Sequence, residues 1–311
     1  MDFLHESQQV SRVTPVPPGQ AATLAGPGMD LPFVQNVRPS DARLPLIMGV
    51  VNVTTDSFYD GGRFVEPRVA FEHMQRLVEE GAEILDLGAE STRPGHQAVS
   101  AAAQIERLGP LLPTAVRLAP CVSVDTSDPE VARFALERGA RIINDVSCLA
   151  EPELAHVVGE ANATLVITHS RGPQSQQRGQ FRSEDYTDVV AQVRDEWKAA
   201  AHRAVQLGVA EGSVWFDPGI GFAKNARQSY EVLRALADYG TMRVPLVLGV
   251  SRKSFISAAF DCPAEERLPG TIAACVHAYC AGVAVLRVHD VAALRQALAV
   301  TRSIHHPDNQ I

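Results

Sequence analysis

Short apolar runs alternate with amphipathic segments along the chain from Leu44 to about residue 302. Each apolar run has the length of a β-strand and leads into a polar loop. Apolar positions three and four residues apart then follow, a spacing that predicts a helix. Ala70, Met74 and Leu77 mark one face of the first such helix. The expected strands lie in the eight runs at 44–52, 82–88, 121–127, 140–147, 163–172, 214–216, 244–255 and 284–290.

This alternation predicts the fold class. Short apolar strands that alternate with helices pair in parallel, and the helices cover the sheet. Eight such units in a chain of this length fit a closed barrel. We therefore predict an α/β protein, a (β/α)8 TIM barrel, in a single domain over residues 44–302. Residues 1–43 are rich in proline and lack sustained periodicity, so we expect a partly flexible N-terminal extension, and residues 303–311 a C-terminal tail.

Composition narrows the range of partners. The formal net charge is −8 and no basic run is present, which argues against a nucleic-acid-binding surface. No run of apolar residues is long enough to cross a membrane, and the N-terminus does not resemble a signal peptide. The five cysteines are odd in number and form no C-x-x-C pair, so we expect free thiols and a cytoplasmic protein.

Polar residues stand at the carboxyl end of every expected strand. In a barrel these ends surround one mouth, where barrel enzymes place their chemistry. Strand ends are also polar simply because they leave the core, but this does not explain why most of these residues are acids, amides or cations. We therefore expect one site built from Asn52, Asp86, Asp125, Asn144, His169, Asp217, Lys253, Arg287 and His289.

The site residues separate into two groups by charge. The acidic and amide group suits a flat nitrogen heterocycle with several N–H donors, such as a pterin or guanine-like ring, because an unpaired buried carboxylate is costly. The cations near strands seven and eight suit a phosphate, which barrel enzymes commonly bind there. Asn52 could hold a Mg²⁺ ion that the phosphates also bind. A metal cluster of three aspartates is the alternative, although the spacing matches no recognised ligand motif.

Two residues also have simpler interpretations. Asp217 lies in the run SVWFDPGIGFAK (213–224), where Gly219 and Gly221 allow backbone to approach a ligand. The same run could be an ordinary strand-to-helix turn with Asp217 capping the helix. His169 is as consistent with a hydrogen-bonded structural histidine as with a catalytic one, and we assign it no role.

Several runs together resemble the dihydropteroate synthase family over about residues 44–302. Each run alone is a weak signal, but their joint order and spacing are specific. The matching runs are GVVNVTTDSFYDGG (49–62), LDLGAESTRPG (85–95), SVDTSDPEVA (123–132), INDVS (143–147), FDPGIGFAK (216–224), VSRKSFI (250–256), ERLPGTIAA (266–274) and RVHDV (287–291).

The resemblance implies a transferase of folate biosynthesis. Members condense 6-hydroxymethyl-7,8-dihydropterin diphosphate with p-aminobenzoate to 7,8-dihydropteroate and release diphosphate, using Mg²⁺. They usually form homodimers and are targets of sulfonamides.

The resemblance also implies a role for each matching residue. Asp125, Lys253, Arg287 and His289 would be catalytic. The pterin would be bound by Asp86, Asp125, Asn144, Asp217 and Lys253. The diphosphate would be bound by Arg287, His289 and Asn52, with Asn52 also at the metal. The p-aminobenzoate pocket would be formed by Phe58, Thr92, Arg93, Pro94, Phe222 and Ser251.

A few positions depart from the family's usual residues. Thr55 replaces a proline of the first loop, and Ala89 and Ala223 replace glycines. If residue 223 needs a positive φ, alanine costs roughly 1 kcal/mol there. Thr168 and Ser170 flank His169 where the family tends to have methionine, which removes apolar contact to a pterin face.

Two alternative functions follow from the same residues. A pterin-dependent methyltransferase domain shares the barrel and the pterin carboxylates but lacks the arylamine pocket, so the runs SRKSFI and STRPG argue against it. A catalytically silent paralogue that binds pterin would first lose the arylamine loops or the phosphate ligands. Arg93, Lys253, Arg287 and His289 are all present, which favours the enzyme.

Overall fold

The computed structural model describes residues 37, 39–41, 43–53, 67–90, 99–171 and 186–308. The chain divides into two compact units, Met1–Phe33 and Val34–Ile311, and every described residue belongs to the second unit. The predicted N-terminal extension therefore falls almost wholly outside the described residues. Within them, no helix is long and apolar enough to span a membrane.

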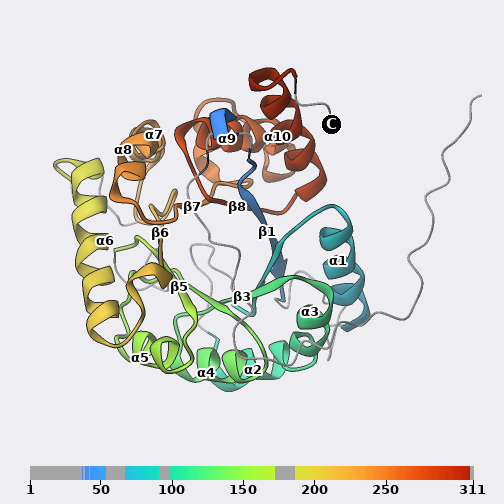
Figure 1. Cartoon of the computed structure of the whole chain (residues 1–311), viewed down its shortest axis with the longest axis vertical. Coiled ribbons are helices and arrows are strands. Elements are labelled where there is room, and N and C mark those ends of the chain that lie inside the picture. The colour runs from blue at the N-terminus through green and yellow to red at the C-terminus, as the bar shows by residue number, and fades with distance from the viewer. Residues whose placement is uncertain are drawn as a thin grey trace, which may run out of the picture. The chain divides into compact units, whose positions relative to one another are not determined.

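Eight parallel strands form one sheet in the order β6-β5-β4-β3-β2-β1-β8-β7 (Figure 1). A parallel bridge between Phe216 and Leu246 links the two ends of this order, so the sheet is a nearly closed barrel, as predicted. The strands are β1 (Leu46–Asn52), β2 (Ile84–Gly88), β3 (Cys121–Asp125), β4 (Ile142–Asp145), β5 (Thr164–Thr168), β6 (Val214–Asp217), β7 (Val247–Gly249) and β8 (Val285–Val288).

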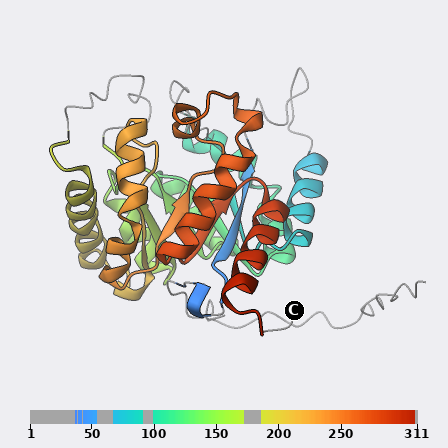
Figure 2. The same ribbon diagram turned by 90° about the horizontal axis from the view of Figure 1, so that it is seen from above.

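At least one helix follows each strand, and the helices surround the sheet (Figures 1 and 2). Two helices follow β2, where prolines interrupt the apolar periodicity, and two follow β6. The helices are α1 (Pro67–Glu79), α2 (Ala101–Leu108), α3 (Leu112–Leu118), α4 (Pro129–Glu137), α5 (Glu153–Glu160), α6 (Val189–Gln206), α7 (Ala226–Arg234), α8 (Leu236–Tyr239), α9 (Leu268–Ala281) and α10 (Val291–His305).

Capping residues in the sequence account for several of the helix ends. Asp128 caps α4, where its Oδ1 accepts hydrogen bonds from the backbone N–H groups of Glu130 and Val131. Gly282 ends α9 in the left-handed conformation, with φ 94°. The last helix, α10, continues to His305, three residues past the expected limit of the barrel at residue 302.

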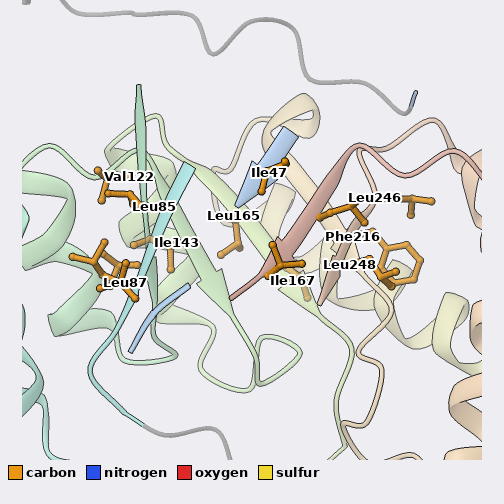
Figure 3. Packing of buried hydrophobic residues seen from close by; sticks show 14 of the residues in the cluster. Ile47, Leu85, Leu87, Val122, Ile143, Leu165, Ile167, Phe216, Leu246 and Leu248 are labelled. Atoms are coloured by element: carbon orange, nitrogen blue, oxygen red, sulfur yellow. The ribbon is translucent and has the colours of Figure 1, made fainter. Parts of the chain in front are cut away.

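Alternate residues of each strand face the helices or the barrel interior. Ile47, Leu85 and Val122 belong to the apolar cluster that packs between sheet and helices (Figure 3). Their neighbours of opposite parity, such as Met48 and Ile84, are buried but lie outside that cluster. Because both faces of the sheet are buried, the strands appear in the sequence as nearly continuous apolar runs.

The bounds of the strands correct the expected positions of three site residues. Asp86 is the middle residue of β2, and Asn144 and Arg287 are the third residues of β4 and β8. None of the three stands at the very end of its strand. A barrel interior is filled by successive layers of inward side chains. Asn144 is level with Asp125, which ends β3, whereas Asp86 is level with Ser123, one layer deeper.

Candidate active site

Arg287 joins two carboxylates at the centre of the mouth. Its Nε donates to Asp86 Oδ2 at 2.6 Å, and its Nη2 donates to Asp125 Oδ2 at 2.9 Å. All three side chains are largely buried, with 19 %, 0 % and 7 % exposure for Arg287, Asp86 and Asp125. Burial by itself would lower the pKa of Arg287, yet the two carboxylates together raise it. The expected separation into an acidic and a cationic group therefore does not apply to Arg287, which pairs with the acids.

One oxygen of Asp86 has no partner among the described residues. Asn144 Nδ2 donates to Asp86 Oδ2 at 3.3 Å, the same oxygen that pairs with Arg287. The other oxygen, Oδ1, is buried without a hydrogen bond. A buried carboxylate oxygen without a donor is destabilising by roughly 1–3 kcal/mol or more. Asp86 Oδ1 is therefore suited to accept from a donor on a ligand.

Asp125 and Asp86 share a single cation. Burial raises the pKa of Asp125 to about 7, and Arg287 counters this shift while Asp86 adds to it. Above this pKa the two carboxylates share one guanidinium, and the group carries a net negative charge. A positive charge on a ligand beside Asp125 would therefore be stabilised.

Lys253 forms a second polar group with Asp217. Its ammonium donates to the carbonyl of Ile220 at 2.7 Å and lies 4.4 Å from the centre of the Phe222 ring. Burial lowers the pKa of Lys253 to about 8, and Asp217 opposes the shift. Burial raises the pKa of Asp217, and Lys253 opposes that shift in turn.

The two polar groups adjoin one another at Gly249. A Cβ at this position would lie 3.8 Å from Arg287 Cδ, from Asp217 Oδ2 and from Lys253 Nζ. A larger residue would thus fill the space between the groups. The predicted residues that the structure brings together are Asp86, Asp125, Asn144, Asp217, Lys253 and Arg287.

The remaining predicted residues lie at the rim or outside the described residues. Ser251 Oγ is 2.9 Å from His289 Nδ1, which pairs a predicted p-aminobenzoate residue with a predicted diphosphate residue. Asn52 ends β1, and its Oδ1 lies 3.9 Å from the place a Cβ on Gly88 would take. The predicted residues Phe58, Thr92, Arg93 and Pro94, together with Thr55, lie outside the described residues.

A buried polar chain that the sequence did not predict lies behind the loop after β6. Lys224, only 8 % exposed, donates to His169 Nδ1 at 2.9 Å. His169 Nε2 contacts Glu196 Oε2 at 3.0 Å, and Arg171 binds the same carboxylate through two nitrogens. His169 thus points toward α6 and away from the mouth, which supports a structural role.

Comparison with known proteins identifies the family. The model of the family described as "Pterin binding enzyme" matches residues 48–289. Dihydropteroate synthase of Synechocystis sp. is 40% identical over 263 residues, which cover 83% of this chain and 89% of that protein. The chain belongs to the dihydropteroate synthases of the pterin binding enzyme family.

Solved structures of this family agree. Xanthomonas albilineans dihydropteroate synthase with 4-aminobenzoic acid matches with a TM-score of 0.78 and 36% identity, over 85% of this chain and 94% of that one. The same organism's enzyme in complex with 7,8-dihydropteroate gives a TM-score of 0.75 and 34% identity, over 85% and 95%. The methyltransferase alternative is not favoured, since these relatives are synthases.

Ala223 departs from the family's usual glycine in a loop where backbone conformation matters. Its φ is 47°, in the left-handed region that glycine adopts without strain. Two residues after Asp217, Gly219 has a φ of 69°, and a Cβ there would lie 1.9 Å from the carbonyl oxygen of His169. The loop therefore requires glycine at 219 and tolerates alanine at 223 with strain.

Replacing Ala223 with glycine is expected to stabilise the fold. Relief of left-handed strain is worth about 1–2 kcal/mol, and the added freedom of the unfolded chain offsets about 0.4–1 kcal/mol of it. We expect a net gain of about 0.5–1 kcal/mol in the free energy of unfolding, measured by urea titration. The control Ala199→Gly, in the exposed middle of α6, should lose about 1 kcal/mol. A loss of stability in both variants would contradict the inference that Ala223 is strained.

His169 is expected to make stability depend on pH between 5 and 6.5. Burial lowers its pKa from 6.5 to about 4, with Lys224 adding to the shift. Below pH 6.5 the unfolded chain therefore binds a proton that the folded chain does not, and stability falls as pH falls. Glu196, whose pKa its partners lower to about 2, changes the free energy of unfolding only below pH 4.5.

The His169→Gln variant tests this pH dependence. At about 1.4 kcal/mol per pH unit, the wild type should lose up to about 2 kcal/mol more than the variant between pH 6.5 and 5. Urea unfolding at both pH values gives the two losses. Equal losses in the two proteins would contradict a neutral, buried His169.

Proposed function

We propose that this chain condenses 6-hydroxymethyl-7,8-dihydropterin diphosphate with p-aminobenzoate to form 7,8-dihydropteroate and diphosphate, a step of folate biosynthesis. The observation that carries the proposal is Asp86 Oδ1, a fully buried acceptor without a donor among the described residues, beside Asp125, which shares the Arg287 cation with Asp86. A dihydropterin ring has amino and N–H donors that match these acceptors. Family membership identifies the reaction that such a site serves.

The pterin would occupy the space between the two polar groups. Asp86 and Asp217 would accept from ring donors, and the Lys253 ammonium would donate to a ring acceptor. Asn144 keeps the second oxygen of Asp86 occupied, which orients the carboxylate toward the ring. Because these groups are buried, a ring that lacked one of the matching groups would leave a polar atom unpaired and bind more weakly.

The two other substrate groups would lie toward the rim. Arg287 uses two of its five N–H groups on carboxylates, which leaves three for diphosphate oxygens. His289 would add a further contact from beyond β8. Phe222 and Ser251 would border the p-aminobenzoate, with Phe58, Thr92, Arg93 and Pro94 completing that pocket. A sulfonamide that presents a similar arylamine would compete there.

Asn52 would be the protein's ligand to Mg²⁺. Mg²⁺ commonly keeps several waters and binds one or two protein oxygens together with substrate phosphates. The half-buried amide of Asn52, near the phosphate side of the mouth, fits such a site. Among the described residues, no group of three His, Cys, Asp or Glu side chains is placed to hold a metal. When bound, the ion would offset charge on the diphosphate.

The residues support a substitution at the pterin methylene. The bond from this carbon to the diphosphate oxygen breaks, and its electron pair leaves with the diphosphate. Asp125 stabilises the positive charge that develops on the dihydropterin, and Arg287 and His289 offset negative charge on the leaving group. The arylamine nitrogen then forms the C–N bond with its lone pair and releases one proton. Because the arylamine is already neutral near pH 7, no strong general base is needed.

Asp86→Asn tests the pterin site by calorimetry with 6-hydroxymethyl-7,8-dihydropterin. Loss of a buried charged acceptor costs roughly 1.5–3 kcal/mol, so we expect affinity to fall at least about tenfold. The control is Asp290→Asn, which removes the partner of Arg252 at the rim. Equal affinity of Asp86→Asn and wild type would contradict the pterin site.

A second copy of the chain is the partner that we expect. Tyr230, Phe255 and Phe260 line an apolar groove between α7 and α9, and Phe260 is 74 % exposed. A groove of this composition supports a homodimer. Sedimentation should show a dimer for the wild type and a monomer for Phe260→Asp; a monomeric wild type would contradict the expectation.

All five cysteines are free, which supports the expected cytoplasmic location.

A further inference from the structure

Lys224 is buried in the loop after β6, and the reaction outlined above gives it no task. Its Nζ lies 2.9 Å from His169 Nδ1, 3.0 Å from the carbonyl oxygen of Gly219 and 3.1 Å from that of Phe222. A fourth and longer contact joins Nζ to the carbonyl oxygen of His169 at 3.4 Å. The three shorter contacts match the three N–H groups of an ammonium. Burial lowers the pKa of Lys224 to about 7, and the nearby Asp217 opposes that shift. The side chain therefore connects the two ends of one short backbone segment to His169.

The segment between those two carbonyls is the part of the loop that contacts Lys253. The Ile220 carbonyl accepts from Lys253 Nζ at 2.7 Å. Gly221 lies against the Lys253 stem, since a Cβ there would be 3.6 Å from its Cδ. The Phe222 ring lies 4.4 Å from the Lys253 ammonium. Three consecutive residues of the loop thus contact Lys253, and Lys224 binds backbone carbonyl groups at both ends of this segment.

We propose that Lys224 is a positioning residue that fixes residues 219–222 and thereby places the Lys253 ammonium at the pterin site. Lys224 itself acts from behind the loop, through His169 and backbone carbonyls. The functional part of this inference rests on the proposed function, because that function gives Lys253 its task.

The contacts behind the loop explain why Lys224 can serve as an anchor. His169 is fully buried, and its backbone N–H donates to the carbonyl of Asp217 at 2.8 Å, which fixes the ring next to the loop. Glu196 accepts from the other ring nitrogen, so Nδ1 is left as an acceptor for Lys224. Arg171 in turn fixes the Glu196 carboxylate. The anchor is therefore tied to α6 and does not depend on a bound substrate.

Hydrogen exchange of the loop amides tests the positioning without any ligand. The Phe222 N–H donates to the Gly219 carbonyl at 3.0 Å, inside the segment that Lys224 fixes. In Lys224→Met, which keeps the length of the side chain but has no donor, we expect this amide to exchange at least tenfold faster. Amides of β5 should keep their wild-type rates, which separates loosening of the loop from loss of global stability.

Ligand binding tests the consequence for Lys253. We expect the affinity for 6-hydroxymethyl-7,8-dihydropterin to fall at least tenfold in Lys224→Met. Lys224→Gln, which retains two N–H donors and guards against misfolding of the methionine variant, should recover part of the loss. The control Lys198→Met removes an exposed lysine of α6 and should match the wild type in both assays.

The two assays separate the inference from the proposed function. Faster exchange at Phe222 together with weaker pterin binding supports the inference. Wild-type exchange and affinity in both Lys224 variants would overturn it. Failure of the wild type itself to bind the pterin would contradict the proposed function, and the exchange rates alone would then decide whether Lys224 fixes the loop.

Discussion

Asp125→Ala and Lys253→Ala are each expected to lower kcat/KM for the pterin diphosphate at least about a hundredfold. In the proposed reaction, Asp125 would supply the charge that faces the developing cation, and Lys253 would supply the donor that orients the ring. Loss of one well-placed electrostatic group typically costs about 10²–10³ in rate. Steady-state release of diphosphate measures the effect. Asp128→Asn is a matched control, because asparagine caps α4 as well as aspartate does.

The same two residues are expected to set the pH dependence of kcat/KM. Asp125 must be ionised, and its pKa is about 7, so activity should fall as pH falls through 7. Lys253 must be protonated, and its pKa is about 8, so activity should fall as pH rises through 8. The profile should be a narrow bell. In Asp125→Asn the acid limb should disappear; an unchanged acid limb would assign it to another group.

Arg287→Met is expected to destabilise the fold by about 3–5 kcal/mol, the largest effect on stability that we predict. The arginine is the shared partner of Asp86 and Asp125, and its loss leaves two carboxylates buried without their cation. Urea or thermal unfolding at pH 7 measures the change. Much of the loss should return at low pH, where both carboxylates are neutral.

Arg252→Met is the matched control for this prediction. Arg252 also forms a two-contact pair with a carboxylate, Asp290, but the pair is partly exposed at the rim. Partly exposed pairs contribute about 1 kcal/mol or less. Similar losses of stability in the two variants would show that the buried triad of Arg287, Asp86 and Asp125 contributes no more than a partly exposed ion pair.

The barrel could be predicted because its signal is repeated. A wrong fold would be inferred only if the pattern of all eight strand–helix units were misread. Because both faces of the sheet are buried, each strand also appears in the sequence as an apolar run. The position of Asp86 within its strand could not be predicted, because periodicity locates a strand along the chain only to within a few residues. Side-chain parity then distinguishes Asp125, at an inward position, from Asp145, whose carboxylate accepts from Ser127, Ser147 and the Leu149 backbone.

The contacts between distant side chains could not be predicted. The sequence groups Arg287 with the other cations, whose order along the chain suggests a phosphate site, whereas its partners are 201 and 162 residues away. Lys224 ended a run that matched the family, but nothing in the sequence linked it to His169 or to Glu196 on α6. The one signal in the sequence that points to Lys224 is its place in a glycine-rich loop beside an expected site residue.

Diphosphate release by the purified protein is the most direct test of the proposed reaction. The assay contains the pterin diphosphate and Mg²⁺, with and without p-aminobenzoate, and identifies the product. We predict release that depends on p-aminobenzoate, with 7,8-dihydropteroate formed in equal amount. Pterin binding without condensation would contradict it and would identify a catalytically silent member of the family.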